Sequence, residues 1–239
     1  MSDIDWPRTL CFFAALVAGW LLSGTLKAAG WLPCDIARKA NHVLALAGGA
    51  LWFGWLAPAS AEASTYAAFA LVLPLVGLVC VLRDRPLFRF AFLANTRKSD
   101  APHEAFYFWS SWLVSAAGLA GVQLLLGDVV ITRTAALLVG IGDGIAEPVG
   151  RRLGRHRFRV PSLTRGKPAV RSLEGCAAVF AGCFLTLVGC FGVGSIPVAV
   201  GLALVLALVE AVSPHGLDNL TLPVASALLL RPLLTAGWM

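Results

Sequence analysis

Eight apolar stretches, each close to the length of a helix that crosses a lipid bilayer, dominate this sequence. They lie at 9–25, 43–58, 66–82, 105–126, 129–149, 173–192, 196–212 and 220–238. A transmembrane helix needs about 20 mostly apolar residues, and 58% hydrophobic against 13% charged residues is far from the composition of a soluble domain. We therefore predict an all-α, polytopic membrane helix bundle of about eight transmembrane helices, with residues 1–239 forming one integral membrane domain.

The basic residues are distributed unevenly between the connections. Stretches 26–42, 83–104 and 150–172 hold three, five and eight of the 19 Lys and Arg residues, and the connections between the other runs, 59–65, 127–128 and 193–195, hold none. With eight spans, the three basic stretches fall on one side, which the positive-inside rule makes cytoplasmic. We expect a bacterial inner membrane with both termini outside. The net charge of +6 then reports topology, and we expect no nucleic-acid partner.

Two acidic residues lie in or just after the fifth apolar run. Asp143 lies roughly 10 Å below its cytoplasmic end, where an ionisable group costs about 2.5–3.5 kcal/mol on insertion scales and indicates function. Glu147 follows at i+4 on the same helix face. The pair could hold a divalent cation and phosphates, or it could form salt bridges to nearby arginines. The glycines around it favour close approach of a ligand or of another helix, and these are Gly140, Gly142, Gly144, Gly150 and Gly154.

Further polar residues flank the later apolar runs. Ser172 is placed to cap the sixth span, with Glu174 in its first turn, and Asp218 or Asn219 is placed to cap the eighth. Both helix starts would then direct backbone NH groups toward the basic stretch 150–172, an arrangement that suits a polyphosphate. Glu210 lies near the end of the seventh span, where the helix dipole disfavours a carboxylate, so we expect it to have a cationic partner.

The first basic stretch contains "RKANH", with Arg38, Lys39 and His42 at the start of the second span. Taken alone, this motif is more typical of a topology signal than of a ligand site. However, every strong polar cluster of the chain falls on the same predicted side of the membrane. We therefore expect an active site at the cytoplasmic ends of the helices.

Four motifs resemble those of the CTP-dependent lipid kinases, which include phytol kinase and dolichol kinase and are distantly similar to CDP-diacylglycerol synthases. In family order they are "RKANH", "GDGIAEPVGRRLGRH" from Gly142 to His156, "RSLEG" from Arg171 to Gly175, and "E..SPHGLDNLTLP" from Glu210 to Pro223. The resemblance covers most of the chain, and the motifs are more specific as a set than singly. It implies transfer of the γ-phosphate of CTP to an isoprenoid alcohol such as phytol, geranylgeraniol, farnesol or a longer polyprenol.

The resemblance also implies roles for individual residues. Asp143 and Asp218 would hold Mg²⁺, and Glu147 would complete the coordination or accept the proton of the lipid hydroxyl, which makes these three the catalytic residues. Glu210 would support the site by orienting a cation. The nucleotide would be bound by Arg38, Lys39, His42, Arg151, Arg152, Lys167, Arg171, Ser172, Glu174, Gly175 and Asn219.

Two departures and two alternatives accompany this interpretation. Position 171 is Arg where the family commonly has Lys, which keeps the charge but not the geometry. The synthases carry a second aspartate three residues after the first, where this chain has Thr221, and this favours a kinase over a phosphatidate cytidylyltransferase. A membrane transporter is the other alternative. The expected partners are CTP, a membrane lipid alcohol and the bilayer, and the glycine-rich helix faces leave oligomer formation open.

Overall fold

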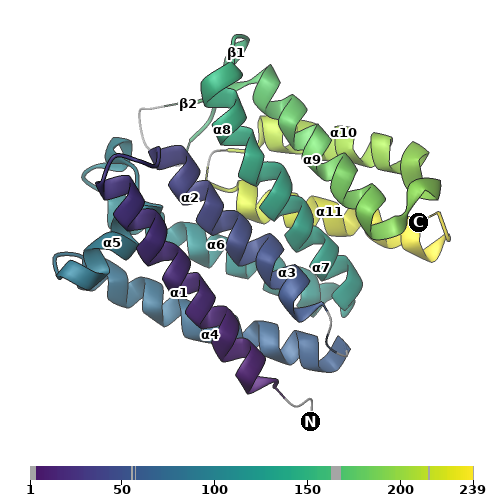
Figure 1. Ribbon diagram of the computed structural model, residues 1–239. Helices are drawn as coiled ribbons and strands as arrows, with labels where there is room; N and C mark the ends of the chain where they lie inside the picture. Colours follow the sequence, from purple (N-terminus) through teal and green to yellow (C-terminus); the bar gives the residue numbers. More distant parts are fainter. Residues whose placement is uncertain (1–3, 55, 57, 163–167, 215, 239) are drawn as a thin grey trace. The chain divides into compact units, whose positions relative to one another are not determined.

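The computed structural model describes residues 4–54, 56, 58–162, 168–214 and 216–238 (Figure 1). The chain divides into two compact units, Met1–Ala116 and Ala117–Met239. The first unit contains α1 (Trp6–Ala28), α2 (Cys34–Val43), a π-helical turn (Leu44–Gly48), α3 (Gly49–Phe53), α4 (Pro58–Val81), α5 (Pro86–Asn95), a short 3₁₀ turn (Lys98–Asp100) and most of α6 (Glu104–Leu126).

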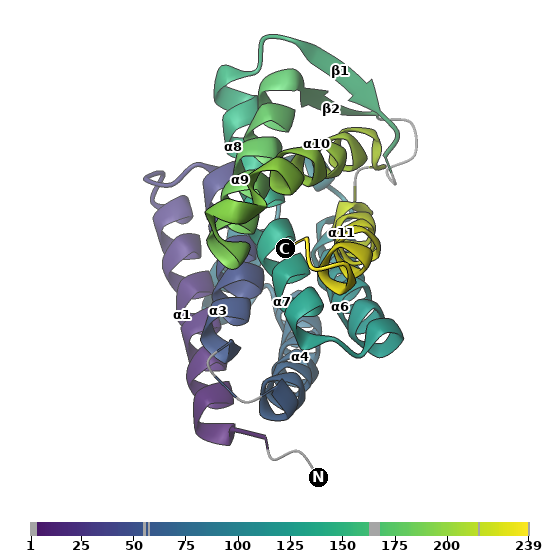
Figure 2. The same cartoon turned by 90° about the vertical axis from the view of Figure 1, so that its right-hand side faces the viewer.

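The second unit begins within α6 and is also helical, apart from one β-hairpin. Its elements are α7 (Val129–Leu138), a π-helical turn (Val139–Asp143), α8 (Gly144–Leu153), β1 (Arg157–Val160), β2 (Ala169–Ser172), α9 (Leu173–Phe191), a 3₁₀ turn (Val193–Ser195), α10 (Ile196–Val212) and α11 (Asp218–Thr235). The two strands pair antiparallel and join the end of α8 to the start of α9 (Figure 2).

Six helices in the described part of the chain are long and apolar enough to cross a membrane. They are Trp6–Ala28, Ser60–Val81, Glu104–Leu126, Val129–Leu153, Leu173–Phe191 and Val193–Val212. The predicted all-α membrane helix bundle is therefore confirmed, and the chain is an integral membrane protein. The expected spans 43–58 and 220–238 are also helical over most of their length, but they are not among these six. The run 43–58 is divided by the first π-helical turn, and α11 contains Pro223 and Pro232.

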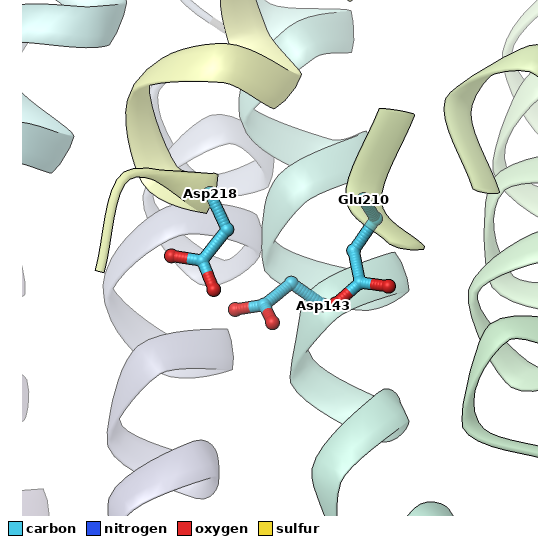
Figure 3. Close-up of side chains that lie close together, drawn as sticks. All are labelled: Asp143, Glu210 and Asp218. Atoms are coloured by element: carbon cyan, nitrogen blue, oxygen red, sulfur yellow. The ribbon is translucent and has the colours of Figure 1, made fainter. Parts of the chain in front are cut away.

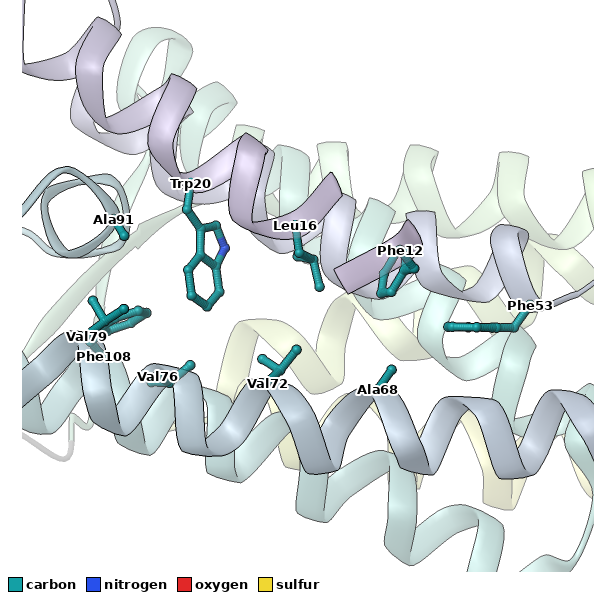
Figure 4. Close-up of a cluster of buried hydrophobic side chains, with 10 residues drawn as sticks. All are labelled: Phe12, Leu16, Trp20, Phe53, Ala68, Val72, Val76, Val79, Ala91 and Phe108. Atoms are coloured by element: carbon teal, nitrogen blue, oxygen red, sulfur yellow. The ribbon is translucent and has the colours of Figure 1, made fainter. Parts of the chain in front are cut away.

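The first unit is held together by an aromatic and aliphatic core between α1, α4 and α6 (Figure 4). Trp20 is only 1% exposed, and its ring packs edge-on against Phe108 and Trp112 at centroid distances of 5.9 and 5.3 Å. Helix α1 approaches α5 very closely, because a Cβ at Gly24 would lie 1.9 Å from the carbonyl oxygen of Phe90. Only glycine allows this helix crossing.

Polar side chains in the same unit bind one another. Asn41 of α2 donates to Ser23 Oγ of α1 at 3.0 Å and to Asn95 Oδ1 of α5 at 3.4 Å. Lys27 Nζ donates to the carbonyl oxygens of Leu93 and Thr96, at 2.6 and 2.7 Å, at the C-terminal end of α5. These bonds fix α2, which carries the "RKANH" motif, against α1 and α5.

Candidate active site

Three carboxylates of the second unit converge at one point (Figure 3). Asp143, Glu210 and Asp218 each offer an oxygen, and these oxygens all lie within 4.8 Å of one another. Asp143 and Glu210 are only 5% and 6% exposed. Buried carboxylates this close together require cations that compensate their charge. We call this cluster the carboxylate triad, and it is the candidate active site.

The three carboxylates come from three different helical segments. Asp143 is the last residue of the π-helical turn between α7 and α8, and π-turns within helices are frequent at functional sites. Glu210 lies in the last turn of α10, and Asp218 is the first residue of α11. Ser213 Oγ, just after α10, lies 2.7 Å from the hydroxyl of Thr221 in α11, and this contact holds Glu210 and Asp218 on neighbouring helix ends.

The side chain of Arg171 faces two carboxylates of the triad. Arg171 of β2 forms an ion pair with Glu210 through Nη1, and its Nη2 lies 3.6 Å from Asp218 Oδ2. The Arg171 side chain is only 9% exposed. Arg171 is thus the cationic partner that the sequence predicted for Glu210. It therefore compensates part of the negative charge of Glu210 and Asp218.

The donor set fits a divalent metal ion. Mg²⁺ and Ca²⁺ prefer oxygen ligands, at about 2.0–2.1 and 2.3–2.6 Å respectively, so oxygens on opposite sides of one ion lie about 4–5 Å apart. Separations within 4.8 Å are compatible with one such ion. Of these residues, the sequence predicted Asp143 and Asp218 as metal ligands and gave Glu210 only a supporting role. The fold places Glu210 beside them.

The start of α9 is built by tight packing against α8. Ser172 caps α9 by accepting a hydrogen bond from the backbone NH of Gly175 at 3.1 Å, as predicted. A Cβ at Gly150 or Gly154 would lie 3.0 or 2.7 Å from Ser172 Oγ, and one at Gly142 would lie 2.9 Å from Cys183 Sγ. These glycines let α9 approach, so helix packing accounts for the part of the glycine pattern that the sequence left open.

Glu174 contacts His156, a residue to which the sequence assigned no role. It lies in the first turn of α9, as predicted, and its Oε1 accepts a hydrogen bond from the His156 backbone NH at 3.2 Å and lies 2.8 Å from His156 Nδ1. This pair ties the chain between α8 and β1 to α9. The role of Glu174 toward a nucleotide stays a prediction.

The remaining residues at the end of α8 lie one to three turns after Asp143. Glu147 Oε1 accepts a hydrogen bond from Arg151 Nε at 3.1 Å, and its side chain is 15% exposed. Arg152 donates to the carbonyl oxygen of Pro148 at 3.0 Å. Arg151 and Arg152 are both exposed, so they are open to a soluble ligand.

The predicted cap of α11 is wrong. The N-cap position is occupied by Leu217, which makes no side-chain hydrogen bond to the helix. Asp218 is the first residue of the helix, and its Oδ1 accepts a hydrogen bond from the backbone NH of Asn219 at 3.0 Å. The Asp218 carboxylate belongs to the triad instead. Asn219 is buried, and its Oδ1 has no hydrogen-bond partner among the residues that the structure describes.

Three other predicted nucleotide ligands belong to the first unit. Arg38, Lys39 and His42 lie in α2, where Lys39 is buried, and their role toward a nucleotide stays a prediction. Lys167 lies outside the described residues.

One comparison with known proteins yields a relative. The chain is 31% identical over 118 residues to the phytol kinase of Synechocystis sp.. The matched part is 49% of this chain and 51% of the relative, so the chain spans about half the length of the curated relative that it matches. No protein-family model and no solved structure matches the chain. The chain is therefore similar to a kinase of a lipid alcohol over a shared segment of about half its length.

Proposed function

We propose that this protein is a lipid-alcohol kinase that transfers the γ-phosphate of CTP to an isoprenoid alcohol and gives the lipid monophosphate and CDP. The observation that carries the proposal is the carboxylate triad, with oxygens within 4.8 Å of one another and one buried arginine beside it, in a membrane helix bundle. The similarity to a phytol kinase and the four motifs favour a kinase of lipid alcohols. The donor CTP comes from the motif resemblance.

The triad would hold Mg²⁺ through Asp143, Glu210 and Asp218. When bound there, the ion would neutralise charge on the transferred phosphate and its leaving group. Arg171 keeps Glu210 and Asp218 in place through its ion pairs. Phosphoryl transfer depends mainly on positioning and charge neutralisation, and these residues supply both.

The reaction requires a proton acceptor for the alcohol. The lipid oxygen forms a bond to the γ-phosphorus, the bond to the β-phosphate oxygen breaks, and the hydroxyl proton must leave. Glu147, one helical turn after Asp143, either accepts this proton or completes the metal coordination. Arg151 and Arg152 are exposed beside it and would bind the triphosphate, together with Lys167.

The position of the triad suits a soluble donor and a membrane-bound acceptor. Asp143 lies within the span Val129–Leu153, whereas Glu210 lies within one turn of the end of α10 and Asp218 begins α11. Carboxylates at helix ends are within reach of a soluble nucleotide, and the surrounding spans are in contact with lipid. We propose that this side faces the cytoplasm of a bacterial inner membrane, as the positive-inside rule predicts.

Position 221 distinguishes this chain from the cytidylyltransferases. Here it is Thr221, whose hydroxyl contacts Ser213 and so links α10 to α11. The synthases carry a second carboxylate at this point of the motif. The position thus serves the packing of two helix ends here, which favours the kinase over the synthase.

The test is phosphate transfer from γ-labelled CTP, with ATP in parallel, to a panel of isoprenoid alcohols by purified protein with Mg²⁺. We expect labelled lipid phosphate with CTP and its loss in Asp143→Asn or on chelation of the metal. Release of pyrophosphate with phosphatidic acid would instead assign the synthase activity. A folded protein that neither binds CTP nor labels any lipid would overturn the proposal.

A further inference from the structure

The hairpin between α8 and α9 has two different faces. Cross-strand partners lie on the same face, and successive residues alternate between faces. Phe158 pairs with Arg171, and Val160 pairs with Ala169, on the face that carries the cation of the carboxylate triad. Arg159 pairs with Val170 on the other face, where Val170 is 60% exposed.

Exposed residues also flank the hairpin at both ends. Together with the exposed residues of the outer face they form a set of arginines and apolar side chains that we call the outer arginine patch. It consists of Leu153, Arg155, Arg157, Arg159, Val170 and Leu173. Among the residues that the structure describes, Arg155 and Arg159 have no ion-pair partner, and the Nε of Arg157 donates only to the carbonyl oxygen of Gly154, at 3.0 Å. The patch therefore presents uncompensated positive charge.

The patch is tied to the membrane surface by its connections. It lies between the ends of two spans, Val129–Leu153 and Leu173–Phe191, as the ribbon of Figure 2 shows for α8, the hairpin and α9. Arg157 pairs with Ser172, directly before the second span. Arg159 follows Arg157 by two residues, and a strand rises about 3.3 Å per residue, so Arg159 lies at most about 7 Å from the start of the second span. This distance keeps Arg159 within the headgroup layer for any tilt of the hairpin.

We propose that the outer arginine patch binds the phosphate groups of anionic phospholipids, with Leu153, Val170 and Leu173 inserted among the lipids. Basic residues at this depth attract anionic headgroups, and apolar side chains between them are typical of interfacial segments. Arg159 and Val170 lie on the strand face opposite to Arg171, and the proposed lipid contact does not rest on the kinase activity. Lipid contact would also hold the strand that carries Arg171.

The experiment compares binding of two lipids to the full chain. Purified protein in detergent receives equal amounts of phosphatidylglycerol and phosphatidylcholine, and native mass spectrometry gives the ratio of the two bound lipids. Arg155→Gln/Arg159→Gln removes two charges that carry no internal contact, and Arg155→Lys/Arg159→Lys is the matched control that retains them. Each arginine near an anionic surface contributes about fivefold in affinity, so the Gln variant should lose about 25-fold of the preference for phosphatidylglycerol.

The expected result is a preference for phosphatidylglycerol in the wild type and the Lys variant that is lost in the Gln variant. An unchanged ratio in the Gln variant, or no preference in the wild type, would overturn the proposal. So would a loss of CTP binding at an unchanged lipid ratio, because the patch would then belong to the nucleotide. If the double variant does not fold, Arg159→Gln alone should lose about fivefold. No arm uses kinase turnover, so the result is independent of the proposed activity.

Discussion

The two units of the protein arrange their buried polar side chains differently. The first unit buries Asp35 and Lys39, and it also contains a neutral network in which Ser23, Asn41 and Asn95 hydrogen-bond to one another between helices. In the second, the carboxylates of Asp143, Glu210 and Asp218 lie close together, and Arg171 pairs with two of them, Glu210 and Asp218. Neutral side chains can meet all their hydrogen-bonding needs within such a network, whereas like charges at short range repel one another. We expect the first arrangement to stabilise the fold, and the second, which keeps like charges together, to serve the proposed activity.

Arg171→Met should have the largest effect, because it removes the only described cation that pairs with Glu210 and Asp218. Breaking a buried ion pair from one side destabilises a protein by about 3–5 kcal/mol. We expect a lower thermal midpoint in detergent and no kinase activity. Arg171→Lys keeps the charge without the planar geometry, and it should recover most of the stability. Equal stability of the Met variant and the wild type would show that the two ion pairs contribute nothing.

Asp143→Asn should separate function from stability. We expect phosphate transfer to fall by about 10³-fold or more, equivalent to about 4 kcal/mol in the barrier. Removing one of three crowded negative charges should leave the thermal midpoint unchanged or raise it, since functional sites are often destabilising. In the wild type, Mg²⁺ should raise the midpoint by selective binding to the folded state. A clearly lower thermal midpoint of the Asn variant would contradict the view that Asp143 serves activity rather than stability.

Gly24→Ala tests whether the first unit depends on packing. The new Cβ would lie 1.9 Å from the Phe90 carbonyl oxygen, so α1 and α5 must separate. Overpacking of this kind costs about 1–3 kcal/mol. Gly121→Ala is a matched control, because a Cβ there meets nothing within 4 Å among the described residues. Thermal unfolding of the two variants should differ, and equal midpoints would argue against the close helix crossing.

Asn41→Ala should have the smallest effect. It removes the hydrogen bonds to Ser23 and Asn95, and interhelical hydrogen bonds in membrane proteins contribute about 0.6 kcal/mol on average and 1.7 at most. We expect a small loss of thermal stability with kinase activity largely kept. A loss of activity as large as that of Asp143→Asn would place the neutral network in the site as well.

The sequence predicted the helices of this structure better than the contacts between them. The apolar runs, the Ser172 cap and the need of Glu210 for a cation follow from local rules of length, capping and dipole. The hairpin was missed because the stretch 150–172 reads as a basic loop, although Arg-Phe-Arg-Val alternates polar and apolar residues as a strand does. The capping role predicted for Asp218 was wrong, because an aspartate near a helix start is equally compatible with a position inside the first turn. The metal-binding role that the motif resemblance implies for Asp218 stays a prediction.

The role of Glu210 could not be predicted for a related reason. Its closeness to Asp143 joins positions 67 residues apart in the chain, and no local rule sets the distance between them. His156 was likewise passed over, because its partner Glu174 lies 18 residues away, across the hairpin. Long-range pairs of this kind depend on helix packing that Gly142, Gly150 and Gly154 permit.

The two-faced hairpin also constrains how this chain can vary in length. Arg171 faces the carboxylates while its neighbour Val170 is exposed, and loss of a single residue within β2 would exchange the faces of all residues that precede it. Relatives of this protein can therefore be expected to tolerate substitutions on the outer face of the strand far better than insertions or deletions between Ala169 and Ser172.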